Sequence, residues 1–462
     1  MFKRIPNVFV IVFGLIVFAA ALTWVLPGGS YQRQKIEVEG HTREVLVDGS
    51  FAYQEAVPQH IQVFTAPLHG FMNLGDIIVF IFIVGGAFFI LNESGAIASG
   101  TQRLVKALKG SEYLIIPIVM TFFSFFGAAF GMCEEAMPFA LIFVPLAIAL
   151  GYDSLVGVSL TFLAAGVGFA GAFLNPFTLQ IAQGLAGLQP VSGWGYRSIV
   201  WVIVTAFTIA WVMIYAARIK KDPKRSIMYE IDQSRRAELE ESLAHQTEFT
   251  LRHGLCLLVL VATIVAMIYG VIALEWYIIE LGGLFFAMGV FVGFIAGKSP
   301  DELANAFLEG VKEMSGAALI VGFAGGILVI LESGVILDTI LHGMGTAASS
   351  LPPVLAADAM YVLQMALNFF IPSGSTKAAL TMPLMAPLAD LSGITRQTAV
   401  LAYQFGDGFT NMIIPTSGVT VGTLAMAKIP FEKWFRWVLP LQVAFFILAI
   451  VLLIWPVMTG WE

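Results

Sequence analysis

Long runs of apolar residues alternate with short charged segments along most of the chain. A helix needs about 20 residues to cross the roughly 30 Å hydrocarbon core of a bilayer. Several runs have about that length or slightly more; they cover residues 5–32, 76–98, 198–217, 253–274, 276–297, 314–336 and 437–457. The pattern therefore predicts an all-α polytopic membrane protein.

The first run follows Lys3 and Arg4, as the apolar part of a secretory signal peptide also does. Residues 19–21 are alanines and weakly resemble a cleavage site, so a signal peptide is the alternative to an uncleaved helix. The run is too long for a signal peptide, and more spans follow it. We expect an uncleaved first transmembrane helix.

Three regions do not fit one plain helix each. Residues 113–152 are apolar except for Glu134 and Glu135 in the middle, and residues 154–196 hold no charge over twice the length of one span. Residues 359–427 contain repeated Gly and Pro and four charged residues: Lys377, Asp390, Arg396 and Asp407. We interpret these regions as two helical hairpins that re-enter the membrane and two interrupted transmembrane helices.

The distribution of basic residues orients the spans. With a cytoplasmic N-terminus, a hairpin at 113–152 and one interrupted crossing at 154–196, most of the 24 Lys and Arg residues face the cytoplasm. Two full crossings through 154–196 would place the basic linker at 218–252 outside, against the positive-inside rule. We therefore expect a cytoplasmic N-terminus and an extracytoplasmic C-terminus. A re-entrant hairpin and two full spans both return to the same side, so this rule does not separate them.

The chain divides into five parts on this basis. They are residues 1–75 (first transmembrane helix and an extracytoplasmic β-hairpin loop), 76–217 (a first repeat with the hairpin 113–152 and a broken helix 154–188), 218–252 (a cytoplasmic linker), 253–313 (scaffold helices and an amphipathic helix) and 314–462 (a second repeat with the hairpin 353–391 and a broken helix 396–427). The β-hairpin is predicted by alternating polar and β-branched residues around Glu39-Gly40-His41.

The sequence repeats itself at an offset near 240 residues. Residues 85–97 match 325–336 through a shared Gly-Gly and a shared Glu-Ser-Gly, and the hairpin tip at 130–135 falls opposite 372–377. In the predicted topology the two copies run in opposite directions. Inverted repeats with interrupted helices are typical of secondary transporters, because two similar halves of opposite direction support alternating access. The alternative is a duplicated structural membrane protein without a transport role.

Four irregular segments inside apolar regions are the candidates for a binding site. They are the first tip (130–138), the first break (166–178), the second tip (368–377) and the second break (406–418). Irregular backbone at membrane depth is tolerated only where it lines a cavity or is buried in protein. Helix N-termini at such breaks offer N–H groups to a carboxylate, and carbonyl and hydroxyl oxygens suit Na⁺.

Polar side chains in these segments are the candidate substrate-binding residues: Glu134, Glu135, Asn175, Thr178, Ser373, Ser375, Thr376, Lys377, Asp407, Asn411, Thr416 and Ser417. Charged residues at membrane depth are expected to be functional. The three acidic residues of the set, Glu134, Glu135 and Asp407, are also the candidates for a coupling ion or a carried proton.

Several roles stay open at this point. Lys377 either receives an anion or pairs with Asp407, and one residue of the Glu134–Glu135 pair is alternatively a plain first-turn residue of a helix. Glu93 and Glu332 occupy matched places in the two repeats. They either help to form the site or lie in water at the ends of helices.

Composition narrows the class of protein. The chain is 58% hydrophobic and 12% charged, whereas a soluble domain carries about 25% charge. This excludes a soluble enzyme, a nucleic-acid binder and a disordered protein, and the net charge of −7 argues against a polybasic surface.

Cys133 and Cys256 lie in apolar runs, so neither a disulfide framework nor a metal-binding pair is predicted. The lipid bilayer and a small solute are the expected partners, with no cofactor or bound metal beyond Na⁺ or H⁺ as coupling ion.

Long motifs resemble the YfcC-type branch of the C4-dicarboxylate anaerobic carrier family, within the ion transporter superfamily. They are Gly-Met-Cys-Glu-Glu at 131–135, Gly-Phe-Ala-Gly-Ala-Phe-Leu-Asn-Pro-Phe-Thr at 168–178, Pro-Ser-Gly-Ser at 372–375, Gln-Phe-Gly-Asp-Gly-Phe-Thr-Asn at 404–411 and Ile-Ile-Pro-Thr-Ser-Gly at 413–418. The resemblance implies a bacterial inner-membrane carrier with a scaffold domain, a moving transport domain and often a homodimer. The tips depart from the Ser-Asn-Thr of better-known dicarboxylate carriers; they read Cys133-Glu134-Glu135 and Ser375-Thr376-Lys377 instead.

These features together predict a secondary active transporter of a small carboxylate-bearing solute that works by alternating access. The resemblance implies a basic amino acid antiporter of the arginine/ornithine type, and the alternative is a C4-dicarboxylate transporter coupled to Na⁺ or H⁺. An intramembrane enzyme is the alternative from another class. Gly406-Asp407-Gly408 has the wrong order for an intramembrane aspartyl protease, and no Gly-x-Ser-x-Gly nucleophile elbow is present, so we expect no enzyme activity.

Overall fold

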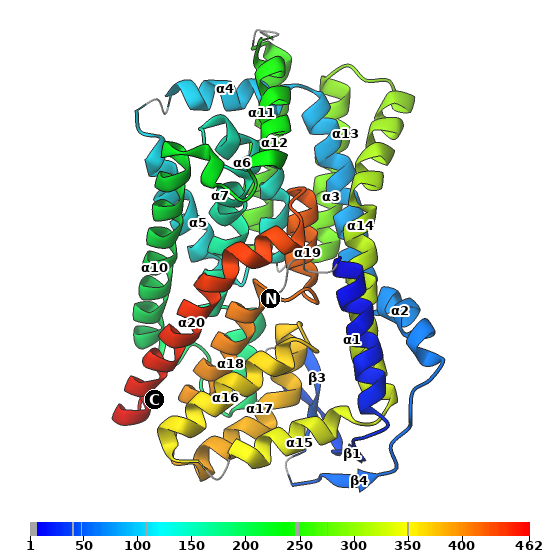
Figure 1. Ribbon diagram of the computed structural model, residues 1–462, viewed down its shortest axis with the longest axis vertical. Coiled ribbons are helices and arrows are strands. Elements are labelled where there is room, and N and C mark those ends of the chain that lie inside the picture. Colours follow the sequence, from blue (N-terminus) through cyan, green and yellow to red (C-terminus); the bar gives the residue numbers. More distant parts are fainter. Residues whose placement is uncertain are drawn as a thin grey trace.

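The chain folds into an elongated bundle of helices with a few short strands at one end (Figure 1). The computed structural model describes residues 7–38, 41–47, 49–107, 110–244, 249–274, 276–348 and 351–462. Lys3, Arg4 and Lys109, which contribute to the predicted orientation, lie outside these ranges.

Six helices of the described chain are long and apolar enough to cross a membrane, and a bent seventh adds to them if its two arms form one span. The six are α3 (Gly75–Glu93), η1 (Glu112–Leu114) with α5 (Ile115–Phe130), α10 (Trp194–Lys221), α12 (Leu251–Ala273), α13 (Ile278–Ile295) and α20 (Phe431–Thr459), and the bent one is α14 (Pro300–Ser333). The prediction of a mostly helical, multi-pass membrane protein is confirmed.

Two predicted boundaries differ from the structure. The apolar run at 5–32 predicts one long first helix, but α1 (Val8–Leu22) ends early because Pro27, Gly28 and Gly29 follow and the chain turns into a strand. The expected division between residues 313 and 314 falls inside α14, shortly before the bend between its two arms, Pro300–Gly316 and Ala318–Ser333.

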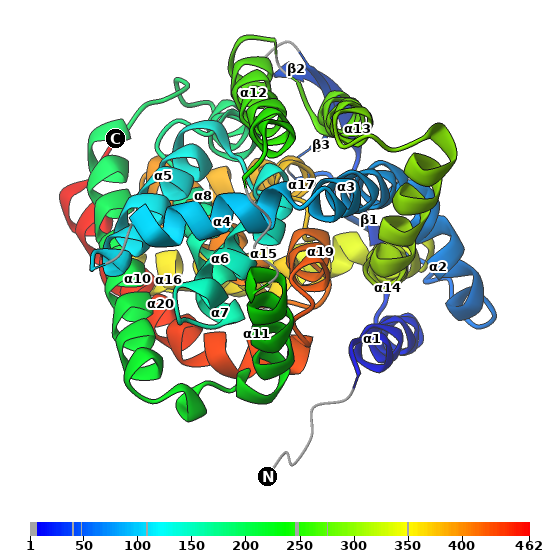
Figure 2. The same cartoon turned by 90° about the horizontal axis from the view of Figure 1, so that it is seen from above.

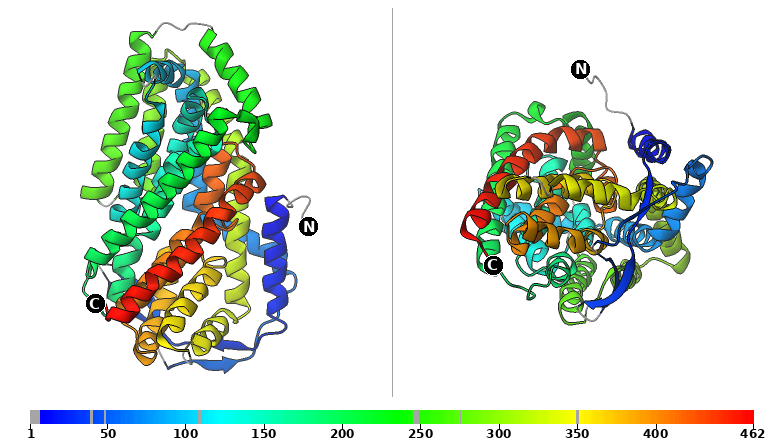
Figure 3. Two further views of the ribbon diagram at one scale, coloured as in Figure 1. Left: turned by 60° about the vertical axis from the view of Figure 1, so that its left-hand side comes forward. Right: turned by 90° about the horizontal axis from the view of Figure 1, so that it is seen from below.

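The strands lie at one end of the bundle, beside α15 (Leu337–Ala348) (Figure 3). Strand β1 (Gly28–Ser30) pairs with β4 (Ala52–Gln54), and β2 (Arg33–Val38) pairs with β3 (His41–Leu46), both antiparallel. In the second pair, Val38 lies opposite His41. Residues 39 and 40, which we predicted as the turn, lie outside the described chain.

Two helix pairs have short irregular turns where the sequence predicts hairpin tips. In the first, α5 ends at Gly131, whose left-handed φ of 70° satisfies the C-cap; the 3₁₀ helix η2 (Glu134–Phe139) and α6 (Ala140–Ala149) follow. In the second, α16 (Pro353–Asn368) ends before Pro372, and α17 (Gly374–Leu391) follows.

Two further helices are interrupted where the sequence predicts breaks. The first begins with three elements in direct succession: α7 (Ser154–Val158), the π-helical stretch η3 (Ser159–Leu163) and α8 (Ala164–Ala170). After a break, the chain continues as η4 (Pro176–Gln180) and α9 (Ile181–Leu185). In the second, α18 (Arg396–Asn411) is followed by a break and then α19 (Gly418–Met426). Both breaks contain a proline, which removes a backbone donor and prevents a continuous helix.

The interrupted helices form the centre of the bundle. Helix α5 packs on α8, α16 packs on α18, and α8 packs on α18. The α8–α18 crossing is close, because a Cβ added at Gly408 would overlap the backbone of Ala170; small residues allow such close approach between helices in a membrane. All of α18 from Gln397 to Thr410 is buried.

The remaining helices cover this centre. Figure 2 shows α2 (Gln62–Asn73), α3, α13 and α14 together on one side, with α10 and α20 on the other. Helix α4 (Ala96–Ala107) and the linker helix α11 (Tyr229–Ala244) lie at the end opposite the strands (Figure 1).

Candidate solute-binding site

A buried ion pair joins the first turn of α17 to the middle of α18. The Lys377 Nζ lies 2.8 Å from the Asp407 Oδ1, and both side chains are 0% exposed. Lys377 also donates a hydrogen bond to the Asn368 Oδ1 at 2.8 Å. Removal of one partner from a buried pair costs about 3–5 kcal/mol, because it leaves the other charge without compensation. Of the two roles that the sequence left open for Lys377, the structure shows pairing with Asp407.

Hydrogen bonds fasten the second tip to α18 around this pair. The Asn368 Nδ2 donates to the Asp407 carbonyl oxygen at 3.2 Å and to the Asn411 Oδ1 at 3.0 Å. The Asn411 Nδ2 in turn donates to the Asp407 Oδ2 at 3.4 Å. On the other side of the turn, the Tyr403 hydroxyl donates to the Gly374 carbonyl oxygen at 2.6 Å.

The first tip carries two further acidic residues, of which Glu134 comes near the same region. Glu135 is 2% exposed, and its Oε2 has no hydrogen-bond partner in the part of the chain that the structure describes. Glu134 is half-buried and lies within electrostatic range of Asp407 on α18. The turn itself is fixed against the first break, because the Gly131 Cα leaves no room for a Cβ beside the Asn175 side chain.

The first break presents a capped helix start to the second tip. The Asn175 Oδ1 accepts hydrogen bonds from the backbone N–H groups of Phe177 (2.9 Å) and Thr178 (3.2 Å), as an N-cap residue does. A Cβ added at Gly374 would lie 2.5 Å from the Thr178 Cγ2 and 2.9 Å from the Asp407 Oδ2. The second tip therefore touches both breaks.

Two polar atoms of the first break are buried without a partner among the described residues. They are the Asn175 Nδ2 and the Thr178 Oγ1, and their residues are 0% and 2% exposed. A buried polar group without a hydrogen bond costs about 1–3 kcal/mol, so such atoms mark places where a solute or water can bind.

The second break is built in the same manner. The Ser417 side chain caps α19 by accepting from the Thr420 N–H at 3.4 Å, and the Thr420 hydroxyl bonds to the Asn411 carbonyl oxygen. Thr416 is buried, and its hydroxyl has no partner within the described ranges. Thr416 and Ser417 therefore lie at the start of α19, which the Thr420 hydroxyl links to Asn411.

Three predicted residues of the second tip are less buried than Lys377. Ser373 and Thr376 are exposed, with Ser373 donating to the Thr376 Oγ1 at 3.0 Å, and Ser375 is half-buried. Thr376 lines a cavity on the side of α17 that faces the strands. The structure thus separates these residues from the buried group around Asp407.

The matched glutamates of the two repeats have different surroundings. Glu93 pairs with Lys298 at 2.8 Å near the end of α3, which removes it from the central group. Glu332 lines the same cavity as Thr376. The internal match in the sequence did not distinguish the two.

Sequence reasoning missed Asn368, which bridges Lys377, Asp407 and Asn411. Its position is the last residue of α16, directly before the irregular tip. A buried amide directly before an irregular tip is a signal that polar partners lie nearby.

No group of three or more His, Cys, Asp or Glu side chains is placed to hold a metal ion within the ranges described above. The central group instead offers both signs of charge, namely the Lys377 ammonium and the carboxylate of Asp407, with the Glu134 carboxylate within electrostatic range. It also offers helix N-termini and unpartnered hydroxyl and amide groups. This chemistry suits a small solute that carries a carboxylate, a cationic group or both.

Two curated proteins are similar to the chain over almost its full length. One is the "Putative basic amino acid antiporter YfcC" of Escherichia coli (strain K12), which is 38% identical over 99% of this chain and 97% of its own. The other is an uncharacterized protein of Haemophilus influenzae, which is 32% identical over 97% of this chain and 96% of its own.

Two solved transporters also align with the chain. Neisseria gonorrhoeae MtrF, from a class described as antimetabolite efflux pumps, gives a TM-score of 0.43 at 18% identity over 98% of this chain and 95% of its own. The Alcanivorax borkumensis YdaH transporter gives a TM-score of 0.41 at 17% identity over 98% of this chain and 100% of its own.

The family of C4-dicarboxylate anaerobic carriers has a sequence profile that matches residues 5–458. A match over nearly the whole chain, together with a relative at 38% identity, shows that the entire protein is related to this family. The family consists of transport proteins, so the chain is a transporter and not an enzyme. The protein belongs to the C4-dicarboxylate anaerobic carrier family.

Proposed function

We propose that the protein is a secondary active transporter that exchanges basic amino acids of the arginine/ornithine type across the bacterial inner membrane. The observation that carries the proposal is the buried group at the second tip. There Lys377 and Asp407 pair at 2.8 Å with no exposure to solvent, and Glu134 of the first tip lies within electrostatic range of Asp407. A basic amino acid carries a carboxylate and two cationic groups, so it is complementary to such a mixed set.

The binding mode follows from the positions of the charges. The solute's carboxylate meets the start of α17, where the backbone N–H groups and the positive end of the helix dipole favour an anion. Its cationic side chain meets Glu135 or Glu134, and Asp407 accepts the α-ammonium when Lys377 moves away. The name of the Escherichia coli relative supports this substrate class.

Alternating access uses the inverted repeat that the sequence indicates. In this proposal the pairs α5–α6 and α16–α17 are re-entrant hairpins that open to opposite sides of the membrane. The packing of α5 on α8 and of α16 on α18 supports two related halves. The strands then lie on the extracytoplasmic side, and the linker helix α11 and the N-terminus lie in the cytoplasm.

A C4-dicarboxylate transporter coupled to Na⁺ or H⁺ is the second candidate. The description of the family favours it, as does the buried ammonium of Lys377, which can receive a carboxylate. In this case Glu134 and Glu135 carry protons or hold the coupling ion instead of binding the solute.

Counterflow in proteoliposomes separates the two candidates. Vesicles preloaded with unlabelled arginine are diluted into labelled arginine, ornithine or lysine, and a parallel set is preloaded with succinate and diluted into labelled succinate. Exchange of basic amino acids that needs no Na⁺ gradient supports the proposal. Exchange of succinate alone, with no uptake of arginine, ornithine or lysine, overturns it in favour of the second candidate.

A further inference from the structure

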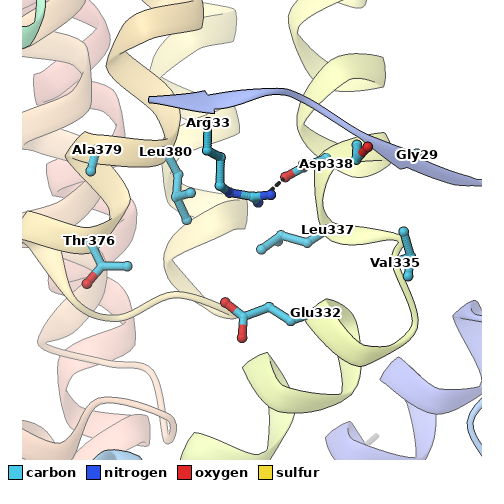
Figure 4. A pocket seen from close by; sticks show the side chains of 10 residues that line it. Gly29, Arg33, Glu332, Val335, Leu337, Asp338, Thr376, Ala379 and Leu380 are labelled. Carbon is cyan, nitrogen blue, oxygen red and sulfur yellow. Dashed lines mark hydrogen bonds and ion pairs between the residues drawn. The ribbon is translucent and has the colours of Figure 1, made fainter. Parts of the chain in front are cut away.

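A cavity of about 610 Å³ lies between the strands, the end of α14, α15 and the start of α17. Its polar lining includes one residue from each of four elements, as Figure 4 shows: Arg33 of β2, Glu332 of α14, Asp338 of α15 and Thr376 of α17. The volume lies within the roughly 300–1,000 Å³ range of small-molecule sites. The cavity is therefore large enough for an amino acid.

The charges in the cavity leave one carboxylate available. The Asp338 Oδ1 pairs with the Arg33 Nη2 at 3.0 Å, and the Asp338 Oδ2 accepts the Tyr31 N–H at 2.9 Å. In the part of the chain that the structure covers, Glu332 makes no ion pair, and its side chain points into the cavity (Figure 4). Arg33, Asp338 and Glu332 together carry a formal charge of −1, so the lining favours a cation.

Glu332 differs in its surroundings from Glu93, the residue that matches it in the sequence. Glu93, the matched residue, is neutralised by Lys298 at 2.8 Å. Among the described residues, no lysine or arginine forms an ion pair with Glu332; Arg33, the basic residue of the lining, pairs with Asp338 at 3.0 Å. The two glutamates are therefore equivalent in sequence but different in the ligand that they can take.

The first turns of α17 separate the cavity from the buried ion pair. Thr376, Ala379 and Leu380 face the cavity, whereas Lys377 points to Asp407 and is 0% exposed. Consecutive residues of a helix differ by about 100° in direction, so one wall presents both surfaces. A solute in the cavity lies one helix thickness away from the central group.

We propose that this cavity is an outer binding site for a guanidinium or ammonium compound, with the Glu332 carboxylate as its counterion. Its place on the transport route rests on the proposed function, but the cation binding itself does not. The site collects a cationic solute beside the second tip before the tip moves and admits it to the central group.

Charge-selective labelling of a cysteine in the cavity tests this site without any transport measurement. Thr376→Cys is introduced into the full chain in a Cys133→Ala/Cys256→Ala background. It is reacted with two methanethiosulfonates of similar size, one bearing a trimethylammonium group and one bearing a sulfonate. Rates are divided by those for a free thiol in solution. Leu380→Cys provides a second labelling position if Thr376→Cys does not fold.

The expected result is a corrected rate about tenfold higher for the cationic reagent, the order of magnitude for one unit charge at short range in a partly hydrated site. Glu332→Gln brings the ratio of cationic to anionic labelling rates close to one. The matched substitution Glu93→Gln leaves this ratio unchanged. Methylguanidinium at millimolar concentration slows the labelling. A ratio near one in the parent, or a ratio that Glu332→Gln does not change, overturns the inference. Charge-selective labelling in a protein that fails to exchange arginine supports the cavity site and overturns only the proposed function.

Discussion

Thr376 and Lys377 are consecutive residues of α17, yet Thr376 lines an open cavity and Lys377 is buried against Asp407 at 2.8 Å. The first turn of α17 is therefore held in place from its inner side. Movement of this turn, which the proposed transport cycle needs, requires that the ion pair separate or acquire a substitute partner. The pair is thus both a structural tie and a place where a charged solute can compete.

Asp407→Asn tests the strength of this tie. The substitution leaves the Lys377 ammonium buried without a counter-charge, so we expect the free energy of unfolding to fall by about 3–5 kcal/mol. Thermal unfolding of the purified protein in detergent measures the change.

The surface pair of Lys428 with Glu313, at 2.9 Å, provides the matched control for Asp407→Asn. Glu313→Gln is expected to change stability by less than about 1 kcal/mol, since exposed pairs contribute little. The double variant Lys377→Met/Asp407→Asn should recover most of the loss, because no unpaired charge remains. A single variant Asp407→Asn as stable as the parent would show that the ion pair does not stabilise the tip.

Glu135→Gln addresses the cation-binding side of the proposed site. Its carboxylate is 2% exposed, with one oxygen unpartnered among the described residues. A hydrogen bond to a charged group contributes about 1.5–3 kcal/mol, so we expect arginine counterflow to fall by about tenfold or more. The unfolding temperature should stay close to that of the parent.

The exposed Glu309, which pairs with Lys312, provides the control, and Glu309→Gln should retain full arginine exchange. Undiminished counterflow by Glu135→Gln would remove this residue from the substrate site.

The long helices and the positions of the breaks could be predicted from the sequence because they depend on local features. Apolar runs of membrane length, the Asn175-Pro176 step and the glycines around Asp407 act within a few residues. The choice between the two faces of α17 could not be predicted. Ser373, Thr376 and Lys377 are all polar residues at one helix start, and only the packing of α17 on α18 determines which of them is buried.

Long-range partners explain the other differences between prediction and structure. Glu93 and Glu332 occupy matched positions, but Lys298 lies beside the first and the Arg33–Asp338 pair beside the second. These neighbours come from distant segments, so the local match carries no information on them. Asn368 was missed for the same reason, since its partners lie in α17 and α18.

Gly408→Ala tests the close crossing of the two interrupted helices. An added methyl group would overlap the Ala170 Cα and Cβ, and the backbone of α8 has to shift to receive it. We expect a loss of about 1–3 kcal/mol in the free energy of unfolding, as for other overpacked positions. Gly283→Ala in α13 is the control, because an added Cβ there meets nothing within 4 Å. Equal stability of both variants would mean that the α8–α18 contact is looser than the structure shows.

Asp232→Asn tests how the linker helix α11 holds the start of the first interrupted helix. The Asp232 Oδ2 accepts hydrogen bonds from the Ser154 N–H at 2.8 Å and the Ser154 hydroxyl at 2.9 Å, and the side chain is 1% exposed. An uncharged amide accepts more weakly and adds donors that lack partners, at a cost of about 1–3 kcal/mol. Because the contact lies at one end of the bundle, the cost should appear as local opening before global unfolding. Hydrogen exchange in α11 and α7 should then accelerate by about tenfold or more, since 1.4 kcal/mol corresponds to a factor of ten.

Asp222→Asn, at an exposed cap of the same linker, is the control and should leave hydrogen exchange in α7 unchanged. If Asp232→Asn also leaves it unchanged, the hydrogen bond from Arg236 to the Tyr152 carbonyl oxygen at 2.8 Å is sufficient to dock the linker.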